Sequence, residues 1–408
     1  MRDPSVLIVH NRYLERGGEE AVFEAEASLL EVNGHRVGRL LFDNQALPAH
    51  PSAIQKAGLA FETVWSNAAR QRLQQAIDGF RPDVVHFHNT LPRVSPAAYA
   101  VAKASGAAVV QTLHNFRLVC ANGLMYRDGH PCEDCLGKTF PLPALQHSCY
   151  RGSRTQTAAV VAMLAVHRAR GTWLNDVDLY ISPSEFLREK LVAGGLPRDR
   201  VVVKPNFVAP DPGMGRGDGG YVLFVGRLTA AKGIETLLEA YRLCADLPPV
   251  HVAGDGELAP ALRIAAALDS RIVYKGRLHR DGVMQEMDGA ACLVFPSRWY
   301  ENFPVTIVEA FARGLPVVAS RLGAIASIVD DRRTGRLFRA GSAADLADKL
   351  TDTLTQVEPQ RRMGVAARDE YLQNYTGERN YAALTGIYEQ ALGGRVPALK
   401  RTLAAHVI

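Results

Sequence analysis

Residues 291–320 have the sequence ACLVFPSRWYENFPVTIVEAFARGLPVVAS, and this stretch decides the fold. It begins with an apolar run typical of a buried strand, continues through a polar loop into an apolar helical pattern, and ends in a second apolar run. Pro304 stands where the first helical turn would begin, and Gly314 stands where the helix would end. A strand–helix–strand unit of this kind predicts parallel strands joined by a crossover helix.

Two glutamates flank the predicted start of this helix. Glu301 lies in the loop before it, and Glu309 lies about two turns into it. The free N–H groups and the positive dipole end of a helix N-terminus favour anionic or hydroxyl-rich ligands. The pair therefore suits recognition of sugar and ribose hydroxyls. Two solvated surface glutamates are the alternative interpretation.

A second segment has the composition of a phosphate site. Residues 221–242, YVLFVGRLTAAKGIETLLEAYR, predict a buried strand, a glycine turn and then a helix. Arg227 and Lys232 place two positive charges on this one short connection. Arginine can bind a phosphate through two hydrogen bonds, and lysine supplies a point charge. We expect both to bind phosphate, with solvated surface charge as the alternative.

Together, the motifs GRL-x3-KG and E-N-F-P-x4-E-A-x2-R-G-x-P-V-V-A-S-x2-G resemble those of the retaining glycosyltransferases of family 4. The resemblance covers nearly the whole chain, since RGGEEAVFEAEASLLEVNGHRV is similar to the family's glycine loop and first helix. It implies the α/β GT-B fold, with two doubly wound Rossmann-like parallel-sheet domains and a cleft between them. It also implies transfer of a sugar from a nucleotide-diphosphate sugar to an acceptor hydroxyl, with retention.

Strand patterns alternate with helical patterns twice along the chain, which predicts two parallel sheets covered by helices. The predicted strands lie at 6–10, 36–42, 83–88, 108–114, 179–184, 201–206, 221–226, 250–256, 271–276, 292–297 and 316–320. The Gly/Pro-dense stretch 210–220 predicts an interdomain linker. We expect an acceptor-side domain at 1–208, a nucleotide-sugar-binding domain at 209–375, and a C-terminal helix within 376–408 that, as in the family, packs back on the first domain.

The resemblance also implies roles for single residues. Glu309 would accept hydrogen bonds from ribose hydroxyls, and Glu301 from hydroxyls of the donor sugar. Catalysis would rest on the residues that neutralise the leaving diphosphate or face the sugar: Arg227, Lys232, Glu301 and His114. Donor binding would use Gly17, Gly18, Arg227, Lys232, Arg277, Leu278, Glu301, Asn302, Phe303, Pro304, Val305 and Glu309.

Three further positions are less regular. His86 and His88 are expected on opposite faces of one strand, so that at most one faces the cleft. Ser327 stands where the family commonly has a glutamate. Because serine carries no charge, the role of that glutamate is not transferred to this chain.

Four of the six cysteines fall within a Gly/Pro-rich insertion at about 117–152. Cys132 and Cys135 form a C-x2-C pair, and Cys120 and Cys149 could complete a tetrahedral zinc site. Unlinked thiols and a redox pair stay open as alternatives. We expect a structural zinc at most, because the family's transfer chemistry generally works without a metal and no D-x-D motif is present.

Composition narrows the function further. The chain has 408 residues, 47% of them hydrophobic and 22% charged, which is ordinary for a two-domain globular protein. A net charge of +5, dispersed along the chain, argues against nucleic-acid binding but permits contact with an anionic membrane surface. No signal peptide and no apolar run of membrane-spanning length is apparent, so we expect a cytoplasmic protein, with peripheral contact at the inner membrane face.

The most specific expectation is a hexosyltransferase that uses a UDP-sugar rather than a GDP-sugar and acts in polysaccharide or lipid-linked oligosaccharide assembly. A catalytically silent nucleotide-sugar-binding module is the alternative. A nicotinamide-dependent oxidoreductase does not fit, because the first strand is followed by NRYLERGGEE rather than by G-x-G-x-x-G.

Overall fold

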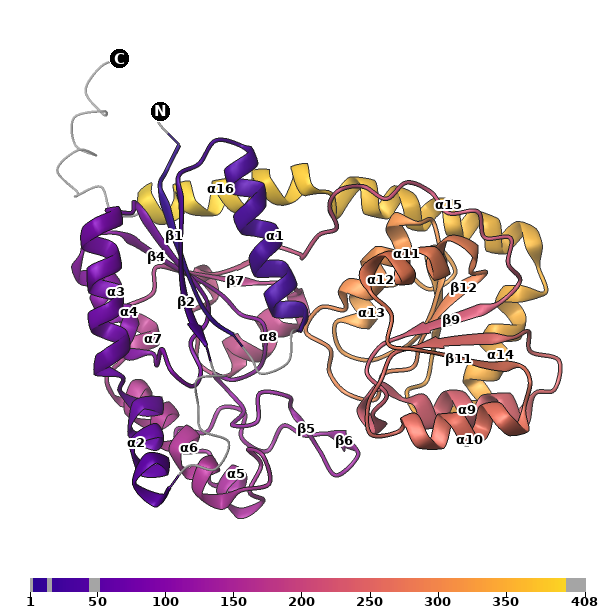
Figure 1. Ribbon diagram of the computed structural model, residues 1–408, viewed down its shortest axis with the longest axis horizontal. Coiled ribbons are helices and arrows are strands. Elements are labelled where there is room, and N and C mark those ends of the chain that lie inside the picture. The colour runs from indigo at the N-terminus through magenta and orange to yellow at the C-terminus, as the bar shows by residue number, and fades with distance from the viewer. Residues whose placement is uncertain (1–2, 13–16, 44–51, 394–408) are drawn as a thin grey trace. The chain divides into compact units, whose positions relative to one another are not determined.

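The chain folds into two compact units, each built on a six-stranded parallel sheet (Figure 1). The computed structural model describes residues 3–12, 17–43 and 52–393. The first unit draws its described residues from Met1–Gly123, Asp134–Lys204 and Tyr381–Ile408. The second unit is formed by Leu124–Glu133 and Pro205–Asn380.

The first sheet has the strand order β2-β1-β3-β4-β7-β8, and every neighbouring pair is parallel. Its strands are β1 (Val6–Arg12), β2 (Val37–Asp43), β3 (Val84–Asn89), β4 (Ala108–Thr112), β7 (Leu179–Ser182) and β8 (Val201–Val203). Strands β1, β3, β4 and β7 each begin with buried apolar residues, as is typical of a parallel sheet covered on both faces, whereas β2 is mostly half-exposed. A short antiparallel hairpin, which groups with the second unit, is formed by β5 (Tyr126–Arg127) and β6 (His130–Pro131).

Two helices from opposite ends of the sequence complete the core on one face of this sheet. Phe23, Ala27 and Leu30 of α1 (Gly18–Val32) pack there against Val6 and Ile8. Leu384, Ile387, Tyr388 and Ala391 of the last helix, α16 (Gly377–Gly393), join the same cluster. The other helical elements of this unit are α2 (Ala53–Val64), α3 (Asn67–Phe80), α4 (Ala97–Ala104), α5 (Leu142–Gln146), α6 (Arg154–Ala169), α7 (Thr172–Asn175), α8 (Glu185–Ala193) and η2 (Arg198–Arg200).

The second sheet has the order β11-β10-β9-β12-β13-β14 and is also parallel throughout. Its strands are β9 (Val222–Val225), β10 (Val250–Ala253), β11 (Ile272–Gly276), β12 (Cys292–Phe295), β13 (Val317–Ser320) and β14 (Gly335–Phe338). Val222 and Phe224 pack into a core with α9 (Ile234–Leu243), α10 (Ala259–Leu268) and α14 (Ala343–Leu354), whereas the intervening Leu223 is buried on the opposite face. Figure 1 shows α9 and α10 on one side of this sheet and α11 and α12 on the other.

The helices of the second unit follow its strands closely. They are η3 (Ala230–Lys232), α9 (Ile234–Leu243), α10 (Ala259–Leu268), α11 (Arg280–Gly289), α12 (Val305–Ala312), α13 (Ile325–Ile328), α14 (Ala343–Leu354) and α15 (Val357–Asn374). No helix in the described part of the chain is both long enough and apolar enough to cross a bilayer.

The structure differs from the sequence expectations at the junctions. The two units meet along the chain at 204–205 and at 380–381, a few residues from the expected 208–209 and 375–376. The expected linker at 210–220 belongs to the second unit, where the N–H groups of Gly215 and Gly219 donate to the carbonyls of Arg313 and Gly289. The Gly/Pro composition of this stretch predicts irregular backbone, but it does not predict which residues that backbone hydrogen-bonds to. The insertion at 117–152 is divided, since 124–133 group with the second unit.

Edge strand β14 supports a prediction about packing. A Cβ at Gly335 would lie 2.0 Å from the carbonyl oxygen of Val317 on β13, whereas a Cβ at Gly386 on α16 would meet no atom within 4 Å. Gly335→Ala should therefore lower the free energy of unfolding by about 1–3 kcal/mol or more, because the two strands must separate. Gly386→Ala, at an exposed helical position, should raise it by up to about 1 kcal/mol. Urea unfolding of both variants measures this, and equal stability of the two would contradict the close strand contact.

Candidate active site

The strand order of the second sheet changes direction between β9 and β12. The chain adds β10 and β11 on one side of β9 and then places β12, β13 and β14 on the other. At such a reversal the loops after the two central strands diverge, and ligands bind at the carboxyl edge between them. The loop after β9 carries Arg227 and Lys232, and the loop after β12 carries Glu301.

These two loops are joined by an ion pair between Lys232 and Glu301. Lys232 Nζ lies 2.7 Å from Glu301 Oε1. The same oxygen accepts hydrogen bonds from Ser297 Oγ at 2.8 Å and from Trp299 Nε1 at 2.6 Å. Glu301 is only 7% exposed, and three donors on one oxygen fix the direction of its carboxylate. This geometry brings together two residues predicted from the sequence, and it adds Ser297 and Trp299, which the sequence interpretation missed.

Gly233 allows the two loops to approach each other. Its φ of +74° lies in the left-handed region, and a Cβ at this position would lie 1.8 Å from the carbonyl oxygen of Pro296. Any side chain would therefore push η3, and Lys232 with it, away from the loop after β12. The Lys232 ammonium also lies 5.4 Å and 5.3 Å from the ring centroids of Phe295 and Trp299, within cation–π range.

Helix α12 begins beside this ion pair. Pro304 is its N-cap residue, and the first helical residue is Val305, as the sequence predicts. Glu309 lies in the second turn and is partly exposed. Burial raises the pKa of Glu309, and the positive charge of Arg280 opposes that rise. A carboxyl group in these surroundings is ready to accept hydrogen bonds from a ligand that excludes water.

The other predicted donor-binding residues lie on the same edge of the sheet or next to it. Arg227 follows β9 and is exposed, and Arg277 follows β11 and is also exposed. Leu278 is partly buried. Asn302 and Phe303 lie between Glu301 and α12, and the Phe303 ring packs 6.0 Å from the Tyr375 ring. The parallel sheet thus gathers most of this predicted set at the carboxyl ends of β9, β11 and β12.

The first sheet reverses in the same way, between β1 and β3. His10 lies on β1, His88 lies on β3, and His114 lies two residues beyond β4. All three are buried. His88 Nδ1 is 3.0 Å from His114 Nε2, and the rings of His10 and His88 are 6.4 Å apart. The predicted His114 is therefore part of a histidine cluster, of which the sequence interpretation missed His10.

The expectation that His86 and His88 lie on opposite faces was wrong. Side chains alternate along a strand, so residues two apart share a face. The two rings lie 4.4 Å apart. His86 is held by Tyr388 of α16, 2.8 Å from Nδ1, and by Thr112 of β4, 2.8 Å from Nε2. His86 thus has a structural role between the sheet and α16.

Burial keeps these histidines neutral. It lowers the pKa of His114 to about 3, with further contributions from the charges of His10 and Lys204. It lowers the pKa of His10 to about 4, and the charge of Arg12 adds to the effect. Burial is also the main reason that the pKa values of His86 and His88 are well below 6.5.

Glu26, His86 and His88 offer three potential metal-ligand atoms within 4.8 Å of one another. Their surroundings do not suit a cation, because Lys204 Nζ lies 2.6 Å from Glu26 Oε1 and already balances the carboxylate. Both nitrogens of His86 are also engaged. The group is better described as a buried hydrogen-bonding network.

Gly17 and Gly18 form the start of α1. Gly17 is its N-cap residue with extended backbone, and Gly18 is its first residue. A Cβ at either position would meet no atom of the described chain within 4 Å. Packing within the protein therefore does not require glycine here, and close approach of a ligand remains the prediction for this pair.

Two family models match the chain. Residues 6–206 match a glycosyl transferase 4-like domain, and residues 219–356 match the glycosyl transferases group 1. The matches together take in most of the chain, and both predicted motifs of the second unit lie within the second match. The chain belongs to the family 4 type of glycosyltransferases. The sequence motifs indicate the same family.

Curated relatives are similar in sequence to part of this chain. An uncharacterized glycosyltransferase of Methanocaldococcus jannaschii is 27% identical over 216 residues, which are 52% of this chain and 60% of that protein. The phosphatidyl-myo-inositol mannosyltransferase of Mycobacterium leprae is 32% identical over 172 residues, 41% of this chain and 46% of that protein. The chain spans about half the length of these two relatives.

Solved structures resemble this chain over nearly its full length. Anabaena HepE, solved in complex with UDP, has a TM-score of 0.68 at 15% identity and covers 95% of this chain and 100% of its own. Sucrose-phosphate synthase from Thermosynechococcus elongatus has a TM-score of 0.69 at 16% identity, with 96% and 100% covered. At these identities the similarity concerns the fold, and it confirms the predicted GT-B class.

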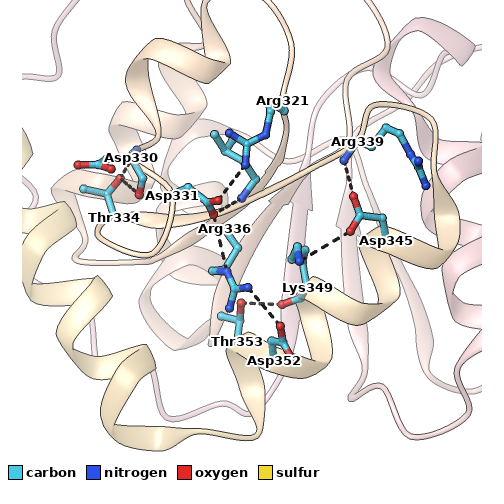
Figure 2. A network of polar contacts seen from close by, with 11 residues as sticks. Arg321, Asp330, Asp331, Thr334, Arg336, Arg339, Asp345, Lys349, Asp352 and Thr353 are labelled. Carbon is cyan, nitrogen blue, oxygen red and sulfur yellow. Dashed lines mark hydrogen bonds and ion pairs between the residues drawn. The ribbon is translucent and has the colours of Figure 1, made fainter.

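The Ser327 side chain forms a hydrogen bond with a neighbouring residue of its own turn. Its Oγ donates a 2.8 Å hydrogen bond to the carbonyl of Ala324 within the short helix α13. Beyond α13, a polar network fixes β14 (Figure 2). Asp331 accepts from Arg321 at 2.8 Å and from the Leu337 N–H at 2.9 Å. The serine therefore belongs to a structural turn in this chain.

The four clustered cysteines of this chain do not bring three potential metal-ligand atoms close together in the described residues. Among those residues, Glu26, His86 and His88 are the group that does so. Cys132 groups with the second unit, whereas Cys120, Cys135 and Cys149 belong to the first. A structural zinc at these cysteines stays a prediction.

The neutral histidines predict how stability depends on pH. An unfolded histidine binds a proton near pH 6.5, but folded His10 does so only near pH 4. The unfolded state therefore holds more protons between these values, and the free energy of unfolding should fall as the pH drops from 7 to 5. His10 alone should account for roughly 1–2 kcal/mol of that fall.

His10→Phe tests this share. The His10 ring stacks on Phe23 at 4.8 Å, and neither of its nitrogens has a hydrogen-bond partner in the described chain, so phenylalanine should be tolerated. The variant should lose less stability than the parent protein between pH 7 and pH 5 in urea titrations. Parallel curves for the two proteins would show that His10 is not a source of the acid sensitivity.

Proposed function

We propose that this chain transfers a sugar from a nucleotide-diphosphate sugar to an acceptor hydroxyl, with retention of configuration. The observation that carries the proposal is the partly buried Lys232–Glu301 ion pair at the reversal of the second sheet, next to the start of α12. Cationic and hydrogen-bond-accepting groups are thereby held at one edge, as the two ends of a sugar diphosphate require. Membership of the glycosyltransferase family supports the same activity.

The second unit supplies the groups for the donor. Arg227, Lys232 and the free N–H groups of α12 would stabilise the diphosphate, which takes up negative charge as the glycosidic bond breaks. Glu309 would accept from the ribose hydroxyls. The base would lie near Arg277 and Leu278. Preorganised charge is what such a donor site needs, and Lys232 is already held by its ion pair with Glu301 in the structure without ligand.

Glu301 would bind the donor sugar through its second oxygen. Oε1 accepts from Lys232, Ser297 and Trp299, so a sugar hydroxyl would be accepted by Oε2. The same carboxylate would stabilise the positive charge that develops at the anomeric carbon. His114, from the first unit, would contact a hydroxyl of the sugar as a neutral group.

We propose a UDP-hexose as the donor. Support comes from Anabaena HepE, which was solved with UDP and with UDP-glucose. A nucleotide panel tests this: UDP, rather than GDP or ADP, should raise the melting temperature, because a ligand that binds only the folded state stabilises it in proportion to the logarithm of its concentration over Kd. Binding of UDP-sugars without turnover on any acceptor would instead favour a silent binding module.

Glu309→Ala should weaken UDP binding about tenfold to a hundredfold, since a hydrogen bond to a carboxylate contributes roughly 1.5–3 kcal/mol. Calorimetric titration of UDP measures the change in Kd. The matched control is Glu358→Ala, which removes an exposed glutamate of α15 in the same unit and should bind UDP as the parent does. An unchanged Kd in Glu309→Ala would remove the ribose assignment.

We further propose that transfer needs no divalent cation, because Arg227 and Lys232 supply the positive charge. Protein rinsed with chelator should keep its transfer rate in EDTA, and added Mg²⁺ or Mn²⁺ should raise that rate less than twofold, or about 0.4 kcal/mol. A rate restored only by a cation would argue against this. Metal analysis of the same sample separately tests the structural zinc, with one zinc per chain expected at the cysteines and none counting against it.

For the acceptor we propose a lipid-linked saccharide at a membrane surface. The Mycobacterium leprae relative is named a phosphatidyl-myo-inositol mannosyltransferase, which supports a lipid-borne acceptor. Exposed apolar side chains lie on or near α2 and α5, namely Phe61, Phe140 and Leu142, at 64%, 49% and 50% exposure. Exposed positive charges at Lys138, Arg151 and Arg154 accompany them. The protein should sediment with anionic vesicles, and a Phe140→Ser/Leu142→Ser variant that sediments equally well would count against this surface.

A further inference from the structure

The carboxylate of Glu301 is held through one of its two oxygens. Oε1 accepts hydrogen bonds from Trp299 Nε1 at 2.6 Å, from Ser297 Oγ at 2.8 Å and from Lys232 Nζ at 2.7 Å. Among the described residues, these three bonds are all that the Glu301 side chain forms, so Oε2 has no partner there. Oε2 is also not one of the buried polar atoms that lack a partner, so a ligand can reach it.

The donors on Oε1 fix a torsion that is otherwise soft. The last torsion of a glutamate side chain has a broad energy profile, so a carboxylate beside a single cation can turn either oxygen toward it, or both. Trp299 and Ser297 donate to the oxygen that faces Lys232, and a rotated carboxylate would leave both donors without this acceptor. The indole nitrogen is a donor only, so it cannot pair with the ammonium instead.

The ammonium of Lys232 is located by contacts other than the carboxylate. It lies 5.4 Å from the ring centroid of Phe295 and 5.3 Å from that of Trp299, within cation–π range. The two rings therefore locate the cation, whereas the Trp299 N–H and the Ser297 hydroxyl orient the anion. Trp299 is the residue that contacts both members of the ion pair.

The loop after β12 alternates in its contacts. Ser297 and Trp299 donate to the Glu301 carboxylate. Arg298 and Tyr300 instead hydrogen-bond to the hairpin segment 124–133 of the same unit, the arginine to a backbone carbonyl at 3.4 Å and the tyrosine to a carboxylate oxygen at 2.9 Å. Alternate residues of one short loop thus serve two different neighbours, and every contact used here lies within the second unit.

We propose that Trp299 is a positioning residue which, together with Ser297, directs Oε2 of Glu301 to the donor sugar and so makes the site select a hydroxyl at one position of that sugar. This inference rests on the proposed function, in which Glu301 binds the donor sugar. An ionised carboxylate oxygen only accepts, so it binds a hydroxyl and forms no hydrogen bond with a sugar that is deoxygenated or acylated there. Trp299 then contributes to recognition of the sugar and leaves recognition of the nucleotide unchanged.

Trp299→Phe tests this role, because it removes the N–H and keeps an aromatic ring beside Lys232. Calorimetric titration of the whole chain, without acceptor, measures the Kd of UDP and of UDP-glucose, UDP-galactose and UDP-N-acetylglucosamine. The UDP-sugar that the parent protein binds most tightly should bind about tenfold more weakly to the variant, the change expected when one hydrogen bond to a carboxylate is lost, whereas the Kd of UDP should change by less than about twofold. A UDP-sugar that loses no more affinity than UDP would overturn the proposal.

Deoxy analogues of that UDP-sugar identify the hydroxyl. In the parent protein, one analogue should bind about tenfold more weakly than the complete sugar, because it leaves Oε2 unpaired. Trp299→Phe should not weaken this analogue further, since a hydroxyl and the acceptor oriented toward it act as a pair and their losses do not add. A general distortion of the loop would weaken every analogue equally, and that result would count against a positioning role.

Tyr300→Phe is the matched control. It removes a hydroxyl from the same loop but leaves the three donors of Glu301 in place, so UDP and the UDP-sugar should bind as they do to the parent protein. If Trp299→Phe does not fold, Ser297→Ala removes the other neutral donor with little change in volume. It should show the same selective loss of affinity for the UDP-sugar, and an equal change for UDP would overturn the proposal.

Failure of the positioning role and failure of the proposed function give different results. If UDP-sugars bind the parent protein but Trp299→Phe shows no selective loss, the positioning role fails and the proposed function stands. If the parent protein binds neither UDP nor any UDP-sugar, the proposed function fails, and crystal structures of the parent and of Trp299→Phe without ligand decide the positioning. The carboxylate of Glu301 should turn in the variant so that Lys232 bridges both oxygens, and an unchanged carboxylate would overturn the proposal.

Discussion

The change of direction in the strand order is the constraint on which the rest of this structure depends. A parallel sheet grows by crossovers of one hand, so a chain that covers both faces with helices must return to the middle of the sheet once. Each unit does so beside its first strand. At that point the loops that follow the two adjacent central strands run to opposite faces of the sheet. Polar side chains from both loops can then meet in the space between them. The Lys232–Glu301 pair and the histidine cluster lie at these two positions.

Both positions solve the problem of burying charge at the edge of an apolar sheet. An isolated buried carboxylate is costly, whereas one that accepts several hydrogen bonds is tolerated. Glu301 is stabilised by Lys232, Ser297 and Trp299 on one oxygen. Glu26 is stabilised by Lys204 alone at short distance, and its other oxygen is directed at a histidine. In each case the partner that neutralises the charge also orients the remaining oxygen.

The sequence predicts the strands well because buried parallel strands are short continuous apolar runs. It misses β14, whose four residues include Arg336, and the two-residue strands β5 and β6, since such short segments carry no periodicity. Lys232 and Glu301 were predicted from motifs although they are 69 residues apart. Glu26 and Lys204, separated by 178 residues, left no local signal, because a glutamate within an amphipathic helix resembles a solvated one. The His86–His88 error came from misapplying the two-residue repeat of a strand.

The contribution of α16 to the first core has a consequence for biosynthesis. Leu384, Ile387, Tyr388 and Ala391 complete the cluster that Val6, Ile8 and Phe23 begin. Domains usually fold in the order in which the ribosome delivers them. Here the first sheet cannot close its core until residues beyond the whole second unit have been translated. The unit that is synthesised first must therefore finish folding last, with one apolar face of its sheet open to chaperones while the other unit is made.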